Sequence, residues 1–274
     1  MPQKKNRSKP SIALAWGTGL IGLLLILALL APVLASFEPD SIDAEQLLSP
    51  PSFQHWMGTD QLGRDVLSRF LFGARISLTV GALIIVIAGC LGILIGSLSG
   101  YFGGWLDQLL MRFTDIMLCF PVFFLILSVI ALIGSSVFNI ILILGLTGWM
   151  GLARLVRAEI LTLKNREYIL VARAYGASDA RLILRHLVPN ASAPIFVTMI
   201  LGIASAILAE SALSFLGVGI QPPTPSWGNM LNDARATLGV AWWMSLFPGL
   251  GIFCAILGFH LIGEGLRNPA GGRP

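Results

Sequence analysis

The sequence predicts an all-α, polytopic membrane protein with about six transmembrane helices. Hydrophobic residues make up 55% of the 274 residues and charged residues only 12%. The mean hydropathy of +0.82 also lies outside the range of soluble globular domains. Long runs without charged residues are the third observation, because a helix that crosses a bilayer needs about 20 predominantly apolar residues.

Five runs reach that length. They cover residues 10–37, 76–106, 116–153, 186–232 and 236–263, and their only charged residue is Glu210. The run over 116–153 is too long for one span and contains Gly134, which is typical of a break. Two helices are therefore expected there, near 110–133 and 137–157, which brings the number of predicted spans to six.

The first predicted span covers residues 12–35 and follows a basic tail, 1–11. Secretory signal peptides also begin with basic residues and an apolar run, but this run is longer than the 7–15 residues of a signal core. An uncleaved helix is expected, followed by an external loop over 36–74. The main transmembrane region is expected over 75–265.

Three charged residues near the end of the external loop predict a local cap and ion-pair set. Asp60 is expected to cap a turn, and Asp65 to lie at the start of the next helix, where a carboxylate is favourable. Arg69 follows Asp65 by one helical turn. We favour this local role over direct contact with a substrate.

The distribution of Lys and Arg orients the chain, because cytoplasmic loops are rich in these residues. If both termini are cytoplasmic, including the tail over 266–274, 14 of the 18 Lys and Arg residues lie inside. The net charge of +4 then reflects membrane orientation. Membrane lipid is the expected environment, and no nucleic-acid partner is expected.

The second and third spans carry two packing signals. Glycines at intervals of four predict a helix face that another helix approaches closely; they are Gly92, Gly96, Gly100 and Gly104. Arg112 is expected to pair with Asp107 or Asp115 at the membrane edge. Pro121 is expected to kink the third span.

A polar, basic, helix-forming segment over 158–189 separates the fourth span from the fifth. One helix is predicted over 166–175 and a second over 180–187. Gly176 is expected to end the first, because glycine readily adopts the left-handed conformation that terminates helices. Such amphipathic helices either contact lipid headgroups or dock into a groove of another protein.

The residues around that glycine have further local signals. Ser178 or Asp179 is expected to cap the second helix. Pro189 suits the first turn of the following span. The density of small residues before Gly176 favours docking against a protein over contact with lipid.

The segment resembles the cytoplasmic coupling loop of permease subunits of ATP-binding-cassette (ABC) importers, where Ala172, Gly176 and Pro189 match the family pattern. It is most similar to the dipeptide, oligopeptide and nickel branch. Further stretches that match this branch are HWMGTDQLGRDVLSR (55–69), GARISL (73–78), GYFGGWLDQLLMR (100–112) and LSFLGVGIQPPTPSWGNML (213–231).

The resemblance implies a type I ABC importer permease fold in the bacterial plasma (inner) membrane. It also implies a homologous permease subunit, two ABC ATPase subunits and an extracytoplasmic solute-binding protein as partners. ATP and Mg would be bound by the ATPases and no cofactor by this chain. The sequence agrees, since it has no GxxxxGK[ST] phosphate loop, and we expect no catalytic and no metal-binding residues.

The resemblance places ATPase coupling on eight residues: Tyr168, Ala172, Arg173, Ala174, Gly176, Ala177, Arg181 and Pro189. The small residues are expected to permit close docking, and the arginines to supply polar contacts. Glu210 is a candidate for the transport pathway, because an ionisable group inside a span is costly without a function or partner. Its alternative is an interhelical hydrogen bond. Trp227 is expected to anchor at the outer membrane interface or to meet the binding protein.

Peptides are the expected substrate. The alternative within the same family is a nickel or metal-chelate importer permease. A proton-coupled secondary transporter would show more buried carboxylates or histidines and an internal repeat. An intramembrane enzyme would need paired catalytic groups, which Glu210 alone does not supply.

Overall fold

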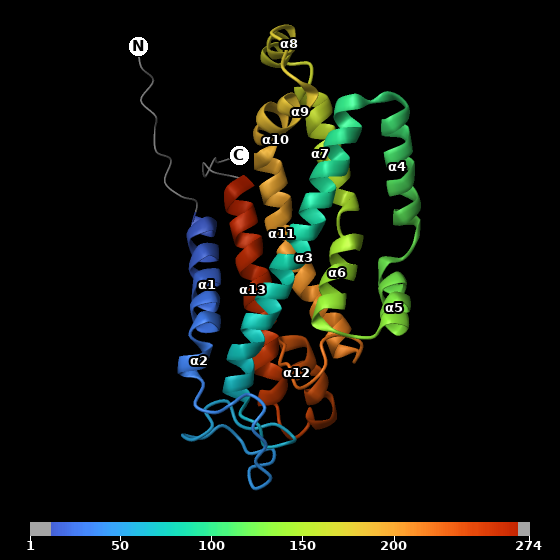
Figure 1. The fold of residues 1–274 in the computed structure, drawn as a ribbon. Helices are drawn as coiled ribbons and strands as arrows, with labels where there is room; N and C mark the ends of the chain where they lie inside the picture. Colours follow the sequence, from blue (N-terminus) through green and yellow to red (C-terminus); the bar gives the residue numbers. More distant parts are fainter. Residues whose placement is uncertain (1–11, 268–274) are drawn as a thin grey trace, which may run out of the picture. The chain divides into compact units, whose positions relative to one another are not determined.

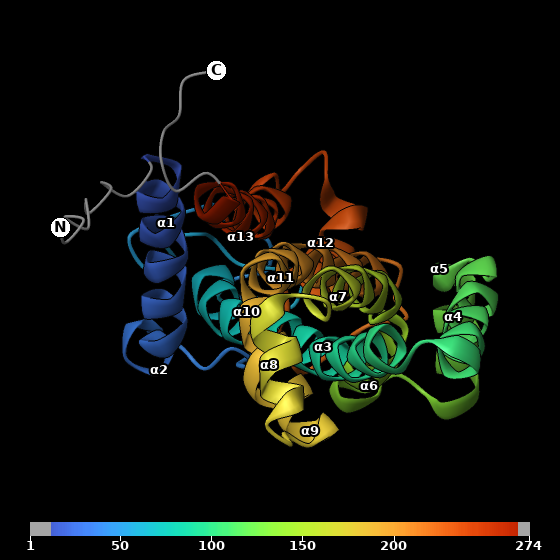
Figure 2. The same ribbon diagram turned by 90° about the horizontal axis from the view of Figure 1, so that it is seen from above.

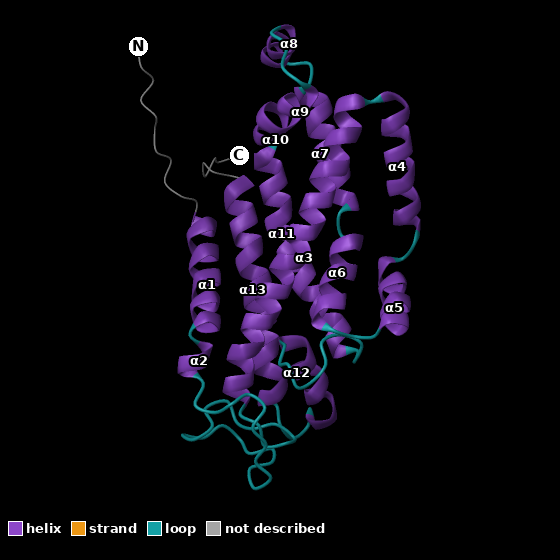
Figure 3. Ribbon diagram, viewed as in Figure 1, coloured by secondary structure: helices purple, strands orange, loops and turns teal. Residues whose placement is uncertain are grey.

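The computed structural model describes residues 12–267, which form helices joined by loops and contain no β-strand (Figure 3). The tail predicted over 1–11 and most of that predicted over 266–274 lie outside the described residues. The longer helices, labelled in Figure 1, are α1 (Ile12–Leu29), α3 (Val66–Phe102), α4 (Gly104–Cys119), α5 (Val122–Ile133), α6 (Val137–Thr147), α7 (Met150–Leu163), α8 (Glu167–Ala174), α11 (Ser192–Phe215), α12 (Trp227–Ala234) and α13 (Trp243–Arg267). The short ones are α2 (Ala31–Leu34), α9 (Asp179–Arg181), the π-helix η1 (Leu182–Leu187), α10 (Val188–Asn190) and the 3-10 helix η2 (Arg235–Thr237).

Within this part of the chain, five helical segments are long and apolar enough to cross a membrane: α1, α3, α6 with α7, α11 and α13. The pair α4 and α5 makes a sixth if it is one broken span, bent by 81°. The bend lies at Pro121, which precedes the first residue of α5 and has no N–H to continue the hydrogen-bond ladder of α4. The predicted fold class and the predicted kink are confirmed.

The chain divides into two compact units. The first comprises residues 1–78 and 207–274, and the second residues 79–206. In the first unit α1 lies beside α13 in both views (Figures 1 and 2). Their backbones approach so closely at Gly17 that a Cβ there would lie 2.8 Å from the carbonyl oxygen of Gly258. Small residues thus allow these two helices to pack directly.

In the second unit α3 packs against α7 along the predicted glycine face. A Cβ at Gly92 would meet Leu152, one at Gly96 would lie 2.5 Å from the carbonyl oxygen of Ala153, and one at Gly100 would meet the backbone of Arg157. The prediction for Gly104 is wrong. That residue follows the end of α3, has φ +56° and begins α4, and no atom lies within 4 Å of its Cβ position.

The packing seam of α3 supplies a first test. We expect Gly96→Ala to destabilise the folded chain by about 1–3 kcal/mol, because the added methyl group must displace backbone atoms. The matched change on α7, Gly151→Ala, is expected to be neutral or slightly stabilising, since no atom lies within 4 Å of that Cβ position. Thermal unfolding of both purified variants in one detergent measures the difference. Equal melting temperatures for the two variants would contradict this close approach of α3 and α7.

Candidate functional site

The second unit contains the predicted coupling loop, with α8 and α9 lying beyond the ends of α7 and α10 (Figure 1). Helix α8 ends as predicted at Gly176, which has φ +82°. The N–H of Ala177 donates to the carbonyl of Ala172 at 3.1 Å, and the N–H of Gly176 donates to that of Arg173 at 2.9 Å. These two bonds form a Schellman motif, which closes the end of a helix and requires the left-handed residue.

The second helix begins at Asp179, but neither predicted cap forms a capping bond. Ser178 occupies the N-cap position and its side chain makes no capping hydrogen bond. Asp179 instead accepts a hydrogen bond from the hydroxyl of Tyr101, a residue of α3. The helix then continues as the π-helix η1 and as α10, so the predicted helix over 180–187 is present with a wider turn.

The coupling loop has a buried side. Ile169, Leu182 and Leu187 are fully buried and join Val156 and Ile160 of α7 in one apolar cluster. Ala172 and Ala177 also pack against this cluster. Their side chains therefore support the loop from within this chain, although both are expected from the sequence to provide room for a partner.

The loop also carries exposed apolar side chains, which occur among exposed charged residues such as Arg166, Glu167 and Arg185. We define the coupling face by Tyr168, Leu170, Val171, Tyr175 and Leu184, whose exposed fractions are 43%, 50%, 53%, 89% and 71%. The other predicted coupling residues that are exposed are Arg173, Ala174, Gly176, Arg181 and Pro189. Among these, Arg173 also reaches back into the chain. Several exposed apolar side chains within one short loop are typical of an interaction surface.

Arg173 connects the loop to the end of α3. Its Nη2 donates to the hydroxyl oxygen of Tyr101 at 3.1 Å, and its guanidinium lies 5.4 Å from the centre of the tyrosine ring. Because Tyr101 also donates to Asp179, its hydroxyl joins α8 to α9. Tyr101 and Asp179 were not predicted to act together, since 78 residues separate them.

The two aspartates of α4, Asp107 and Asp115, do not pair with Arg112 as predicted. Asp107 binds Arg157 through two bonds of 2.6 Å, and Asp115 binds Arg154 at 2.5 Å. Both carboxylates are thus occupied by arginines of α7, and the expected pairing with Arg112 is wrong. Residues 39 and 50 positions away outcompete the local partner, because the packing of α4 on α7 brings their guanidinium groups to the carboxylates.

The first unit contains a buried polar cluster around Glu210. Its carboxylate is fully buried and accepts hydrogen bonds from the hydroxyls of Ser214 at 2.8 Å, Ser211 at 3.3 Å and Ser77 at 3.5 Å. Two of these serines also accept backbone N–H bonds, Ser214 from Ile220 and Ser77 from Trp227. The carboxylate therefore orients hydroxyls that satisfy buried backbone donors. Its role in the transport pathway stays a prediction.

Trp227 is fully buried at the start of α12, so neither predicted location for its side chain, at the membrane interface or against a binding protein, is correct. Its indole Nε1 donates to the carbonyl of Phe70 at 3.2 Å, and the two rings stack at 5.8 Å. Helix α12 itself was not predicted. The signal was present in Ser226 followed by Asn229, which form a capping box at its start.

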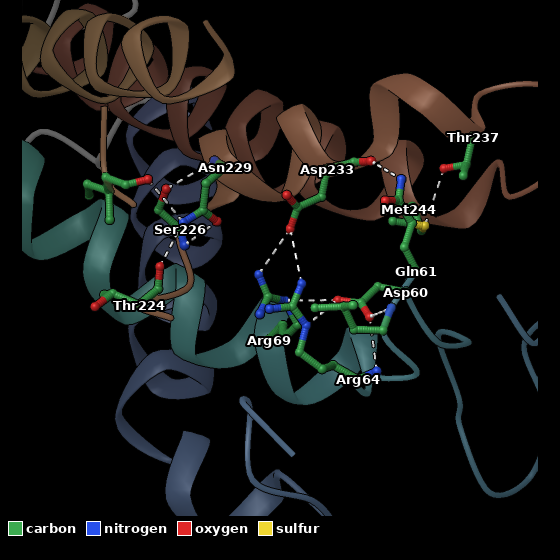
Figure 4. A network of polar contacts seen from close by, with 12 residues as sticks. Asp60, Gln61, Arg64, Arg69, Thr224, Ser226, Asn229, Asp233, Thr237 and Met244 are labelled. Carbon is green, nitrogen blue, oxygen red and sulfur yellow. Dashed lines mark hydrogen bonds and ion pairs between the residues drawn. The ribbon is translucent and has the colours of Figure 1, made fainter. Parts of the chain in front are cut away.

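A second buried network joins the loop before α3 to α12 (Figure 4). Asp60 caps its turn as predicted, accepting from the backbone N–H groups of Leu62 and Arg64 at 2.9 and 3.0 Å. Its other oxygen binds Nε of Arg64 at 2.6 Å. Both Arg64 and Arg69 also contact Asp233 of α12 at 3.3 Å (Figure 4).

This network corrects the prediction of a purely local ion-pair set. Asp65 lies directly before α3, as expected, and accepts the N–H of Ser68 at 2.7 Å, but its other oxygen contacts Nδ1 of His55 at 2.9 Å. Arg69 turns instead to Asp233, 164 residues away. Burial raises the pKa of the Asp233 carboxyl above its ordinary value, and the neighbouring Arg69 and Arg64 act against that shift.

Comparisons with known proteins identify a family and two similar permeases. The family described as "Binding-protein-dependent transport system inner membrane component" matches residues 92–267. The dipeptide transport system permease protein DppC of Alkalihalophilus pseudofirmus is 39% identical over 264 residues, which cover 96% of this chain and 86% of that protein. The glutathione transport system permease protein GsiD of Escherichia coli is 42% identical over 247 residues, or 90% and 82% of the two chains.

Three observations lead to one conclusion. The family match covers more than half of the chain, two relatives align along most of its length, and several of its helices are able to cross a membrane. The chain is a multi-pass membrane protein that belongs to the family of inner-membrane permease components of binding-protein-dependent ABC transport systems.

Proposed function

We propose that this permease forms the membrane pathway of a peptide importer together with a homologous permease subunit. Two ATPase subunits bind and hydrolyse ATP with Mg, and an extracytoplasmic solute-binding protein delivers the substrate. The chain itself catalyses no reaction and binds no cofactor. Family membership and the names of its relatives support this assignment.

The coupling face is the observation that carries the proposal. It presents exposed apolar side chains on a helix pair whose inner side is already packed in this chain. A solvent-exposed apolar face on an amphipathic helix suits a hydrophobic groove on a partner. We assign that groove to the ATPase subunits, with Arg181 supplying a polar contact at the rim.

The orientation follows from the charge around the loop. Seven Lys and Arg residues lie between Arg154 and Arg185, and basic segments next to spans stay cytoplasmic. We therefore assign the coupling face and both termini to the cytoplasm of a bacterial cell, with the chain in the plasma (inner) membrane. The loop over 36–65 would then be extracytoplasmic.

Transport follows from differential binding to two states. ATP binding closes the two ATPase subunits and moves their grooves. The coupling helices move with the grooves, and the spans to which they are attached rotate as rigid bodies. The pathway between the two permeases then opens on one side of the membrane or the other.

The proposed substrates are short peptides, because the relatives are named for dipeptide and glutathione transport. Reconstitution with the partner subunits and the binding protein would test this. We expect ATP-dependent uptake of a labelled dipeptide or of glutathione into proteoliposomes. Uptake of nickel without uptake of either peptide would overturn the peptide assignment and favour the metal alternative.

A double change on the coupling face tests the docking assignment. Tyr175→Asp with Leu184→Asp is expected to reduce the ATPase that co-purifies with the permease by at least about tenfold, because charges at the centre of an apolar interface cost about 1.4 kcal/mol or more. Both side chains are more than 70% exposed, so the fold of this chain should be unaffected.

Phe53→Asp is the matched control, since Phe53 is a fully exposed aromatic residue in the first unit. It should leave ATPase co-purification at the wild-type level. If the double variant retained its ATPase subunits to the same extent as the Phe53 control, the coupling face would not be the docking surface.

A further inference from the structure

The last turn of α3 receives contacts from three later parts of the second unit. We call it the α3 end turn, defined as Ser99, Gly100 and Tyr101. Ser99 donates to Asp107 of α4. The carbonyl of Gly100 accepts from Nζ of Lys164, the residue that caps α7, at 2.9 Å. Tyr101 holds the coupling helices through Arg173 and Asp179.

The bonds of Tyr101 reach both sides of the Gly176 break. Its hydroxyl accepts from Arg173 in the last turn of α8 and donates to Asp179 in the first turn of α9. One oxygen therefore fixes the angle between the two coupling helices. The tyrosine itself is buried, with 7% of its surface exposed, so its ring cannot follow the loop without moving α3.

From this arrangement we infer that Tyr101 is a positioning residue that transmits movement of the coupling helices to α3. The inference rests on the proposed function, because it assumes that an ATPase moves those helices. A hydroxyl that bonds to two partners is directional, since it needs one donor and one acceptor at fixed angles. Movement of α8 or α9 therefore either pulls on the α3 end turn or breaks one of these bonds.

The other contacts of the loop are less specific. The apolar cluster beneath it, which includes Ile169 and Leu187, holds the loop against the spans without a preferred direction of sliding. Loss of the hydroxyl should therefore leave the loop attached but loosely aligned. A change at the hydroxyl should therefore leave assembly with the ATPases intact and reduce only the transfer of movement to α3.

The test is Tyr101→Phe in the reconstituted complex of both permeases, the ATPases and the binding protein. Phenylalanine keeps the ring and its contact with the Arg173 guanidinium but removes both hydroxyl bonds. We expect full assembly and unchanged basal ATPase activity. Stimulation of the ATPase by substrate-loaded binding protein should fall by at least about fivefold, the low end of typical coupling between sites.

Two further variants sharpen the result. Asp179→Ala should also reduce the stimulation, and adding Tyr101→Phe to it should cause less loss than Tyr101→Phe causes alone, because the bond between Tyr101 and Asp179 is then already absent. Thr114→Val is the control: it removes another buried hydroxyl of the second unit, one that donates to the carbonyl of Leu110 in its own helix, and it should leave stimulation unchanged.

Wild-type stimulation in Tyr101→Phe would overturn the inference. So would a parallel loss of assembly and basal activity, which would mean that the tyrosine only supports the fold. Neither outcome affects the proposed function, because that is tested with the wild-type permease, by its assembly with ATPase subunits and by peptide uptake.

Discussion

Arg69→Met is expected to destabilise the first unit by about 3–5 kcal/mol, because it removes one of the two arginines that balance the buried Asp60 and the partly buried Asp233. The side chain of Arg69 is 1% exposed, and it contacts Asp233 at 3.3 Å and Asp60 at 3.6 Å. Arg64 alone would then have to neutralise both aspartates. Removing one partner of a buried charge network costs more than the network itself contributes.

Arg75→Met provides the matched control for this prediction. Arg75 is an exposed residue of the same helix and should tolerate the change. Thermal unfolding of both variants in detergent measures the difference. Adding Asp233→Asn to Arg69→Met should recover part of the lost stability, because it removes one uncompensated charge. Equal melting temperatures for Arg69→Met and Arg75→Met would refute the role of the network.

Glu210→Ala is expected to have an effect of similar size. It would leave the hydroxyls of Ser77, Ser211 and Ser214 without their acceptor, at about 1–3 kcal/mol for each buried group that stays unsatisfied. It would also open a cavity inside a predicted span. The yield of folded, monodisperse permease should fall sharply.

Glu210→Gln separates the structural role from the pathway role. The amide keeps one acceptor oxygen, so stability and transport should recover substantially relative to the alanine variant. If Glu210 instead contacts substrate, both variants should remain folded and lose apparent affinity for peptide to the same extent. Glu264→Ala, at an exposed position of α13, is the control for loss of a carboxylate within a predicted span.

Predictions that depend on a short stretch of sequence were the most reliable. Runs of apolar residues located the spans, because hydropathy over about 20 residues determines whether a helix can cross a bilayer. Pro121 and Gly176 placed a bend and a helix end, because proline and glycine alter the backbone at their own positions. The capping role of Asp60 follows for the same reason, since its oxygen reaches N–H groups two and four residues away.

Predictions were often wrong where the true partner of a side chain lies far away in the sequence. Arg112 was expected to pair with its neighbours, but Arg154 and Arg157 occupy both carboxylates. Trp227 is a residue type that often anchors at the membrane interface, but in this chain it is buried against Phe70. In each case the local sequence offers a suitable partner or environment, and the packing of helices far apart in the chain supplies a closer one.

The amino-acid sequence alone determined that the chain is an all-α membrane protein, where most of its spans lie, and that a basic helix pair is broken at Gly176. These properties depend on hydropathy and on backbone preferences that act over a few residues. Only the tertiary structure decided that Tyr101 holds both coupling helices, that Glu210 organises serines, and that Arg69 binds Asp233. A hydrogen bond or buried ion pair forms only between atoms within about 3–4 Å, and folding alone brings such distant residues to that separation.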